Sequence, residues 1–560
     1  MTKTNWARGA AWAVFSLAWA ALPAEVLAVP DAAPASRGLR NPVDRDLQQL
    51  REDVDRYRVG EEMRRMIEER ERRDAEPAPK KPAPAETSFR FRLNAVDHNA
   101  SSVLTAEEIA AVTKKYEGTE VDMAAVQRLL ADINALYRDK GYVVCEARLR
   151  PQRIRGGRLF VTLVEGRTGL IKVTGNEHTS AGYLEGAFDL EKGEVANYRD
   201  LSADLVHFNM TNDVVLSIDM RAGEEAGTTD YEIRAAEPAN WTATVFADTL
   251  GTRSTGRPRV GASVTNRSVF GRRDSATLLG LASEGSRSFM AGYSIPLTSR
   301  GTRLSANVSV GDVEVIQGDS AELDVTGESE YYSLRLDHPI YADADMKWTV
   351  FGEWTRQNSS TDFYDVTIND TRIDSWRSGF ETILLGDRSV FYFMASVSHG
   401  TVKEYTFDER WTQNIASGNA FWRYAWTDAV STTLSGAWQA VLGGDPLSTT
   451  QYFYLGHTSG VRGYENDVLS AEQGAWVNAQ IDWAFAGPST SLFTFFDAGT
   501  LGGTSSYETR SIASVGAGVT WPLWSGASVT GTVGFPLRRH LDDDMHVNRA
   551  RFDLSVTAVW

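Results

Sequence analysis

The chain has 560 residues and a formal net charge of −17; 23% of its residues are charged and 10% are aromatic. This acidic balance argues against a nucleic-acid partner. A single cysteine permits neither an internal disulfide nor a thiolate metal site, and the eight histidines lack HExxH-like spacing, so we expect no metal and no cofactor.

Residues 1–28 have the composition of a secretory signal peptide. Lys3 and Arg8 precede an apolar run, and small residues lead to Ala28, after which we expect cleavage. The alternative is a membrane anchor, which the shortness of the apolar run and its break at Pro23 disfavour. No later segment has 18 consecutive apolar residues, so we expect a protein that leaves the cytoplasm and does not span a membrane as helices.

Residues 42–75 are predicted to form a helix with acidic and basic side chains interleaved around a thin apolar stripe. The stripe recurs at spacings of three and four: Leu47, Leu50, Val54 and Tyr57. From its residues alone, this helix is either a solvated charged helix or a short coiled coil. The next segment, 76–87, is "EPAPKKPAPAET", which predicts an extended linker.

Residues 88–166 predict a small domain with the element order β-α-α-β-β. The segment "FRFRLNAV" alternates as a strand, and Thr105 and Glu108 are spaced as a capping box. A longer helix follows and ends at Gly141, before two further strands. Cys145 alternates with apolar residues, so we expect a buried small hydrophobic side chain; the alternative is a reactive thiol.

Residues 167–235 repeat the same β-α-α-β-β order. This pair resembles POTRA domains, the periplasmic modules of outer-membrane transporters, and "YRDKGYVVCEARL" and "FVTLVEG" are similar to a first POTRA unit. The resemblance implies that a substrate binds along a sheet edge and the neighbouring helix. Candidate substrate contacts are Tyr137, Tyr142 and Leu149, with core packing as the alternative role for each.

From residue 237 to 560 the helical period gives way to alternation. In "MKWTVFGEW", Trp348 and Val350 share one face, while Lys347 and Thr349 share the other. A soluble sandwich would show the same period, but short Pro-containing turns alternate here with long polar loops, as in transmembrane barrels. At about 20 residues per strand and connection, residues 237–560 predict an antiparallel barrel of about 16 strands. Hydrocarbon tolerates no open sheet edge, so the barrel must close.

The last five strands are predicted from the alternation at the end of the chain: 474–485, 491–498, 510–521, 526–537 and 550–560. We expect both ends of the barrel on the periplasmic side. The fifth strand from the end therefore begins outside, and segment 457–473 is the sixth outer loop.

Three motifs in this region resemble those of two-partner-secretion (TpsB) transporters, the haemolysin secretion/activation family. "VRGY" at 461–464 matches the motif of their sixth loop, and "FFDAG" at 495–499 is similar to their FxDxG motif. "ADTLGTRSTGRPRVG" at 247–261 matches in part, because Thr249 stands where the family has Asn. The resemblance extends over nearly all of the mature chain.

The resemblance implies that the loop folds inward and that Arg462 meets Asp497 on the inner wall. An arginine that loses hydration is best paired with a bidentate carboxylate. The expected site comprises two groups, the loop motif Val461, Arg462, Gly463 and Tyr464, and the wall residues Phe495, Asp497 and Gly499. Alternation alone does not say which face of "SLFTFFDAG" lines the lumen.

The resemblance also implies a function, the export of one large exoprotein from the periplasm to the cell surface without nucleotide hydrolysis. The 42–75 helix would be a plug in the resting pore. Expected partners are the exoprotein and outer-membrane lipid, with room for periplasmic chaperones. The alternative is an outer-membrane protein assembly or insertion factor. An enzyme is not expected, because the chain has no GxSxG motif and no metal triad.

Overall fold

The computed structural model describes residues 42–74, 90–318, 321–466, 468–487, 490–504, 509–542 and 545–560. The predicted signal peptide (1–28) and the predicted linker (76–87) lie outside the described residues. The chain divides into two compact units, one formed by Met1–Glu68 with Ala239–Trp560 and the other by Glu69–Pro238. No helix among the described residues is long and apolar enough to cross a membrane.

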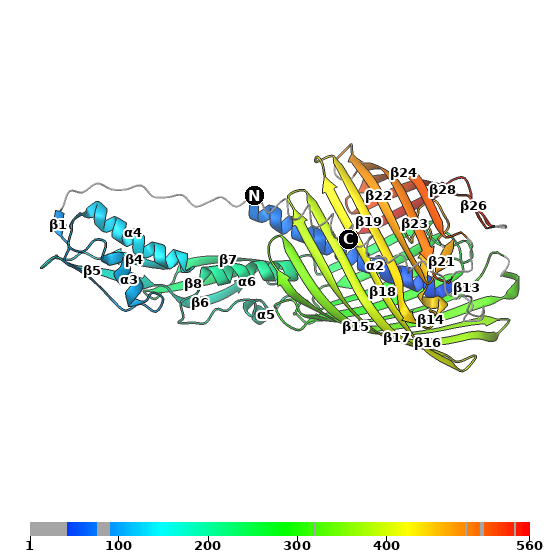
Figure 1. Ribbon diagram of the computed structural model, residues 1–560, viewed down its shortest axis with the longest axis horizontal. Coiled ribbons are helices and arrows are strands. Elements are labelled where there is room, and N and C mark those ends of the chain that lie inside the picture. The colour runs from blue at the N-terminus through cyan, green and yellow to red at the C-terminus, as the bar shows by residue number, and fades with distance from the viewer. Residues whose placement is uncertain are drawn as a thin grey trace. The chain divides into compact units, whose positions relative to one another are not determined.

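The first half of the Glu69–Pro238 unit is the expected POTRA fold, with two more strands than predicted (Figure 1). The predicted strand "FRFRLNAV" is split, because its first part pairs with a short strand ahead of the second helix. The capping box of Thr105 and Glu108 is present. The elements are β1 (Arg90–Arg92), β2 (Ala95–His98), α3 (Ala106–Thr113), β3 (Glu120–Asp122), α4 (Met123–Asp139), β4 (Cys145–Leu149) and β5 (Arg158–Glu165).

The second half has the predicted β-α-α-β-β order. Its sheet runs β6-β8-β7, as the first sheet runs β2-β5-β4. Asn197 begins the long helix and also donates from Nδ2 to the Lys140 carbonyl at 3.0 Å, which ties the two halves together. The elements are β6 (Arg167–Thr174), α5 (Ala181–Glu185), α6 (Tyr198–Thr211), β7 (Val215–Ala222) and β8 (Thr228–Ala236).

The other unit is a closed antiparallel barrel of 16 strands, as predicted. Its strands are β9 (Trp241–Asp248), β10 (Arg259–Asn266), β11 (Ser275–Ala282), β12 (Ser286–Pro296), β13 (Arg303–Glu314), β14 (Val325–Ala342), β15 (Met346–Phe363), β16 (Val366–Gly386), β17 (Ser389–Glu404), β18 (Glu409–Ala425), β19 (Val430–Gly444), β22 (Gln473–Ala484), β23 (Ser491–Gly502), β24 (Ser511–Trp524), β25 (Ala527–Pro536) and β28 (Arg551–Val559). Closure comes from the pairing of β28 with β9.

Alternation along the strands separates a largely polar interior from an apolar exterior. On β15, Thr349, Phe351 and Glu353 are buried inside, whereas Trp348 and Val350 are exposed outside. Exposed tryptophans gather near the strand ends that carry the short turns: Trp241, Trp426, Trp483, Trp521 and Trp560. Such a belt is typical of a membrane interface.

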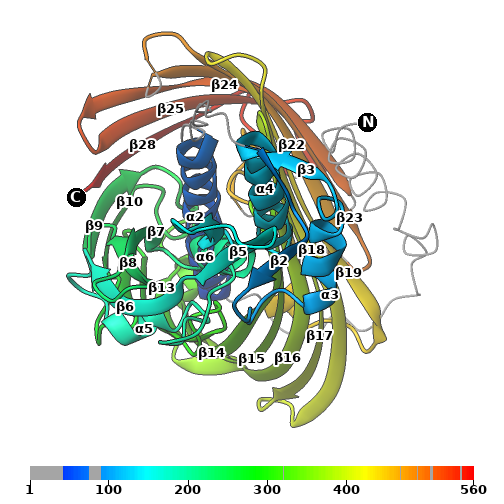
Figure 2. The same cartoon turned by 90° about the vertical axis from the view of Figure 1, so that its left-hand side faces the viewer.

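Helix α2 (Pro42–Asp74) lies inside the ring of strands (Figure 2). Its first turns pack Val43, Leu47 and Leu50 against Met290 and Val313 of the inner wall. The predicted apolar stripe is buried at this end of the helix, but Tyr57, its last residue, is half exposed. Asp44, near the start of α2, contacts a polar part of the wall, whereas Glu52, Asp53 and Asp55 farther along the helix are exposed. Neither interpretation from the residues alone places the helix against an inner wall.

Candidate functional site

The site is built from the sixth outer connection, residues 445–472 between β19 and β22, here called loop 6. The sequence places its start too late, at 457, because the preceding residues include a short strand, β20 (Phe453–Leu455), which pairs with β21 (Leu469–Ala471). Val461 and Tyr464 are fully buried in an apolar cluster that includes Leu501 of β23. Loop 6 therefore folds into the barrel and is held there by packing.

Arg462 meets Asp497 in the predicted bidentate geometry. Its Nε donates to Oδ2 at 2.7 Å and its Nη2 to Oδ1 at 2.8 Å, while its backbone N–H also donates to Oδ2 at 3.1 Å. The guanidinium stacks over the ring of Phe495, 3.7 Å from the centroid. The Asp497 side chain is fully buried and that of Arg462 is 20% exposed. Asp497, Phe493 and Phe495 share the inner face of β23, which the alternation could not decide.

Close backbone approach depends on glycines. Gly463 has φ +92°, and a Cβ there would lie 2.9 Å from the carbonyl carbon of Gly534 on β25. A Cβ on Gly499 would lie 2.6 Å from Leu455 and 3.2 Å from Val461. These two close approaches therefore depend on the missing side chain of Gly463 on the loop and of Gly499 on the wall.

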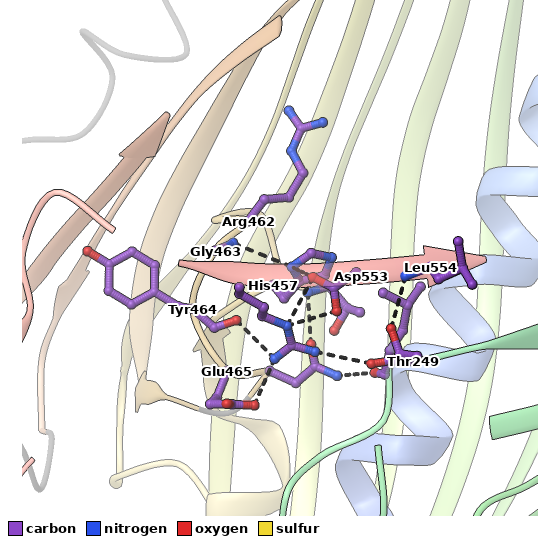
Figure 3. Close-up of polar contacts among 12 residues, drawn as sticks. Thr249, His457, Arg462, Gly463, Tyr464, Glu465, Asp553 and Leu554 are labelled. Atoms are coloured by element: carbon purple, nitrogen blue, oxygen red, sulfur yellow. Dashed lines mark hydrogen bonds and ion pairs between the residues drawn. The ribbon is translucent and has the colours of Figure 1, made fainter. Parts of the chain in front are cut away.

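Tyr464 belongs to the same packing. Its hydroxyl lies 3.0 Å from the Ala513 carbonyl and 2.9 Å from the Arg538 carbonyl, so it ties the loop motif to β24 and to the segment after β25. Figure 3 shows Tyr464 and Arg462 directed to different sides of the loop. Val461 and Tyr464 are held by shape and backbone contacts, whereas Arg462 is held by charge.

Two residues of β22 were missed by the sequence interpretation. Gln480 Oε1 accepts from Nη1 of Arg462 at 2.6 Å, and Asn478 donates to the Gly460 carbonyl. Both lie opposite β23, in the pairs Asn478↔Asp497 and Gln480↔Phe495. The sequence feature that could have identified them is the alternation of these two amide side chains with Ile481 and Trp483, which face outward.

The three POTRA candidates belong to the other unit and lie in or against its core. Tyr137 is fully buried and donates from its hydroxyl to Glu165 at 2.8 Å. Tyr142 and Leu149 are partly buried against the same cluster. Cys145 is buried, and burial raises the pKa of its thiol to about 11, so it is not a reactive thiolate at neutral pH. A substrate could not reach Tyr137 without unpacking this core.

Comparison with known proteins identifies the family of the chain. A sequence model of the haemolysin secretion/activation protein ShlB/FhaC/HecB matches residues 227–521, and one of the ShlB-type POTRA domain matches residues 91–166. The chain is similar to the outer membrane transporter CdiB of Dickeya dadantii, with 24% identity, over 80% of this chain and 83% of that protein. It is also similar to the heme/hemopexin transporter protein HuxB of Haemophilus influenzae (strain 86-028NP), with 23% identity, over 81% and 85%.

Solved structures support the same fold. CdiB from Escherichia coli superposes with a TM-score of 0.67 at 20% identity, covering 94% of this chain and all of that one. BamA from Haemophilus ducreyi lacking POTRA domains 1–3 gives a TM-score of 0.51 at 13% identity, over 84% of this chain and all of that one. Because the family model covers more than half of the chain, this protein belongs to the haemolysin secretion/activation family ShlB/FhaC/HecB.

Proposed function

We propose that this chain is an outer-membrane transporter that secretes one large exoprotein from the periplasm to the cell surface without nucleotide hydrolysis. The observation that carries this function is the interior of the barrel. A closed 16-strand wall surrounds a polar lumen that holds a helix from the N-terminal segment and the inward-folded loop 6. A passage so lined suits an extended polypeptide, whose backbone groups need polar partners while they cross lipid.

In this proposal the two POTRA domains and the barrel have different roles. Residues 88–166 and 167–235 would receive the unfolded exoprotein in the periplasm by adding it as a strand to a sheet edge. Residues 237–560 would conduct it, and folding of the exoprotein outside would prevent its return. Outer-membrane lipid would surround the tryptophan belt. The family members named above are transporters, and we propose no catalytic activity for this chain.

The α2 helix, together with the rest of residues 42–75, would be the resting plug. This proposal rests on polar contacts between α2 and the lumen wall. Asp44 accepts from Gln357 at 2.9 Å and from Ser359 at 2.7 Å, Glu61 pairs with Arg267 at 2.9 Å, and Glu62 pairs with Lys347. These contacts are side-chain hydrogen bonds and ion pairs that water can replace. None of them is a strand pairing, so the helix can leave without unfolding the barrel.

Depletion of the chain in its native host tests the function against the assembly alternative. We expect the exoprotein encoded with it to be lost from the surface and the medium, while porin abundance in the outer membrane stays unchanged. Cell fractionation with quantitative mass spectrometry measures both. A general fall in outer-membrane barrels, with export per remaining barrel unchanged, would instead support the assembly factor.

A further inference from the structure

The barrel closes along a short seam between its first and last strands. β28 faces β9 over five residue pairs, from Ser555↔Asp248 to Val559↔Thr244, whereas its pairing with β25 extends over eight, up to Gly534↔Arg551. The outer end of β28, residues 551–554, therefore lies beyond the last β9 residue. There the Leu554 N–H bonds to the Thr249 side-chain oxygen at 3.0 Å instead of to a strand carbonyl (Figure 3).

Loop 6 spans this outer end of the seam. Asn466 donates to the carbonyl of Leu250, which follows β9 in the chain, and Glu465 pairs with Arg257, just before β10. On the other side of the seam, Glu465 Oε2 accepts from Arg551 of β28 at 2.8 Å. One carboxylate thus bridges the first outer loop and the last strand. The partly matching motif 247–261 gains a structural role through Arg257.

Arg551 is the residue in which these contacts meet. Its side chain is 5% exposed; Nε donates to Asp553 at 2.9 Å and Nη1 to the Tyr464 carbonyl at 3.1 Å. Its Nη2 lies 3.4 Å from the Thr249 carbonyl. Asp553 also lies 3.3 Å from Nδ1 of His457. A planar guanidinium can serve this many acceptors in different directions, whereas a lysine ammonium cannot match its fork.

We propose that Arg551 is a positioning residue that couples the seat of loop 6 to closure of the β9–β28 seam, with Glu465 as the bridge. Arg462 holds loop 6 to β22 and β23, and Arg551 holds the same loop to β28 and to the segment that follows β9. Movement of loop 6 therefore removes the Glu465 and Asn466 contacts that span the seam beyond Asp248. It leaves that end held by the mutual bonds of Thr249 and Leu554. The coupling itself does not depend on the proposed function. Only its use, the adjustment of the passage during export, rests on that function.

Hydrogen–deuterium exchange of the full chain in lipid nanodiscs tests the coupling without any exoprotein. In Arg551→Lys and in Glu465→Gln, we expect about tenfold faster exchange both in residues 457–466 of loop 6 and at the seam amides of Thr249 and Leu554. The Arg462→Lys variant tests whether a change on the far side of loop 6 reaches the seam. Its described contacts lie on β22 and β23, yet it should also speed exchange at Thr249 and Leu554.

The matched control is Arg356→Lys, which alters a barrel arginine paired with Asp374 at 2.7 Å on the neighbouring strand. The described contacts of Arg356 are with Asp374 and Trp354, not with loop 6. It should leave both regions unchanged. Faster exchange confined to β28 in Arg551→Lys, or an unaltered seam in Arg462→Lys, would overturn the coupling. If Arg551→Lys fails to form a heat-modifiable barrel, Glu465→Gln decides by the same criterion. Neither result depends on export, so failure of the coupling is separable from failure of the transporter function.

Discussion

At the scale of single residues, the contact between Arg462 and Asp497 is unequal in its exposure to water. The carboxylate is fully buried, whereas the guanidinium keeps 20% of its surface exposed. Removing the arginine strands a buried charge, which costs about 3–5 kcal/mol where water is excluded and less in a wet lumen. Removing the charge of Asp497 leaves an arginine that still binds Gln480 and stacks on Phe495.

We therefore expect Arg462→Ala to impair export more than Asp497→Asn does, at equal barrel abundance. Secretion of the co-expressed exoprotein, normalised to heat-modifiable barrel on gels, measures the difference. The double variant Arg462→Ala/Asp497→Ala should lose less export than the losses of Arg462→Ala and Asp497→Ala added together, because each single change removes the same contact. Normal export by Arg462→Ala would show that the contact between Arg462 and Asp497 is not needed for transport.

Gly463 allows a cleaner test, because Gly443 provides a matched control. Both have positive φ, +92° and +88°, but a Cβ on Gly443 meets nothing within 4 Å. Alanine at either position carries about 1–2 kcal/mol of backbone strain. Only Gly463→Ala adds a clash with Gly534, worth about a further 1–3 kcal/mol. Loop 6 should thus become more sensitive to added protease in Gly463→Ala than in Gly443→Ala; equal sensitivity would mean that close approach to β25 is unimportant.

Many contacts of loop 6 could be predicted from the sequence, some from physical chemistry and others only from the family resemblance. Glycines beside an arginine predict a tight turn from physical chemistry. The partner of Arg462 came only from the family resemblance, because Phe493, Phe495 and Phe496 give β23 aromatic residues on both faces. Arg551 was not singled out, because its partners Glu465 and Thr249 are remote in sequence.

At the scale of elements, strands were easier to predict than the environment of the helix. A two-residue period survives in any barrel, and the last five strands lie within a few residues of their predicted bounds. Only a thin apolar stripe, confined to the first turns of helix α2, packs against the wall. Its contacts are with side chains on the inner face of strands far away in sequence, such as Lys347 and Gln357, and no local pattern encodes them.

Those contacts predict that charge helps to hold α2 in the lumen. Glu61→Gln together with Glu62→Gln removes two acidic partners and leaves Arg267 and Lys347 without those ion pairs. We expect a larger open fraction in planar bilayers, approaching that of a chain lacking residues 42–75. Glu68→Gln, which alters an exposed acid on the same helix, is the control and should stay closed. A pore that remains closed even after deletion of 42–75 would refute the plug.

At the scale of the whole molecule, the lumen contains two bodies that rest mainly on different walls. Helix α2 contacts β11 to β16 and Arg267, which follows β10. Its Arg45 also lies over the ring of Tyr454 in loop 6, 5.9 Å from the centroid. Loop 6 contacts β22 to β28 and the segment after β9. Gln357 links them, because it donates to Asp44 of α2 and accepts from Gln451 of loop 6 at 3.0 Å.

This arrangement predicts that plug and loop act separately. Deletion of 42–75 should raise conductance, and adding Arg462→Ala should raise it further, because a loosened loop 6 frees more of the lumen. Export, however, should remain as low in the combined variant as in Arg462→Ala alone, since an open pore does not replace a seated loop. Paired conductance and secretion measurements on the single and combined variants decide this. Recovery of export on deleting the helix would mean that Arg462 acts only by releasing α2, and that the contact through Gln357 outweighs the separation of the walls.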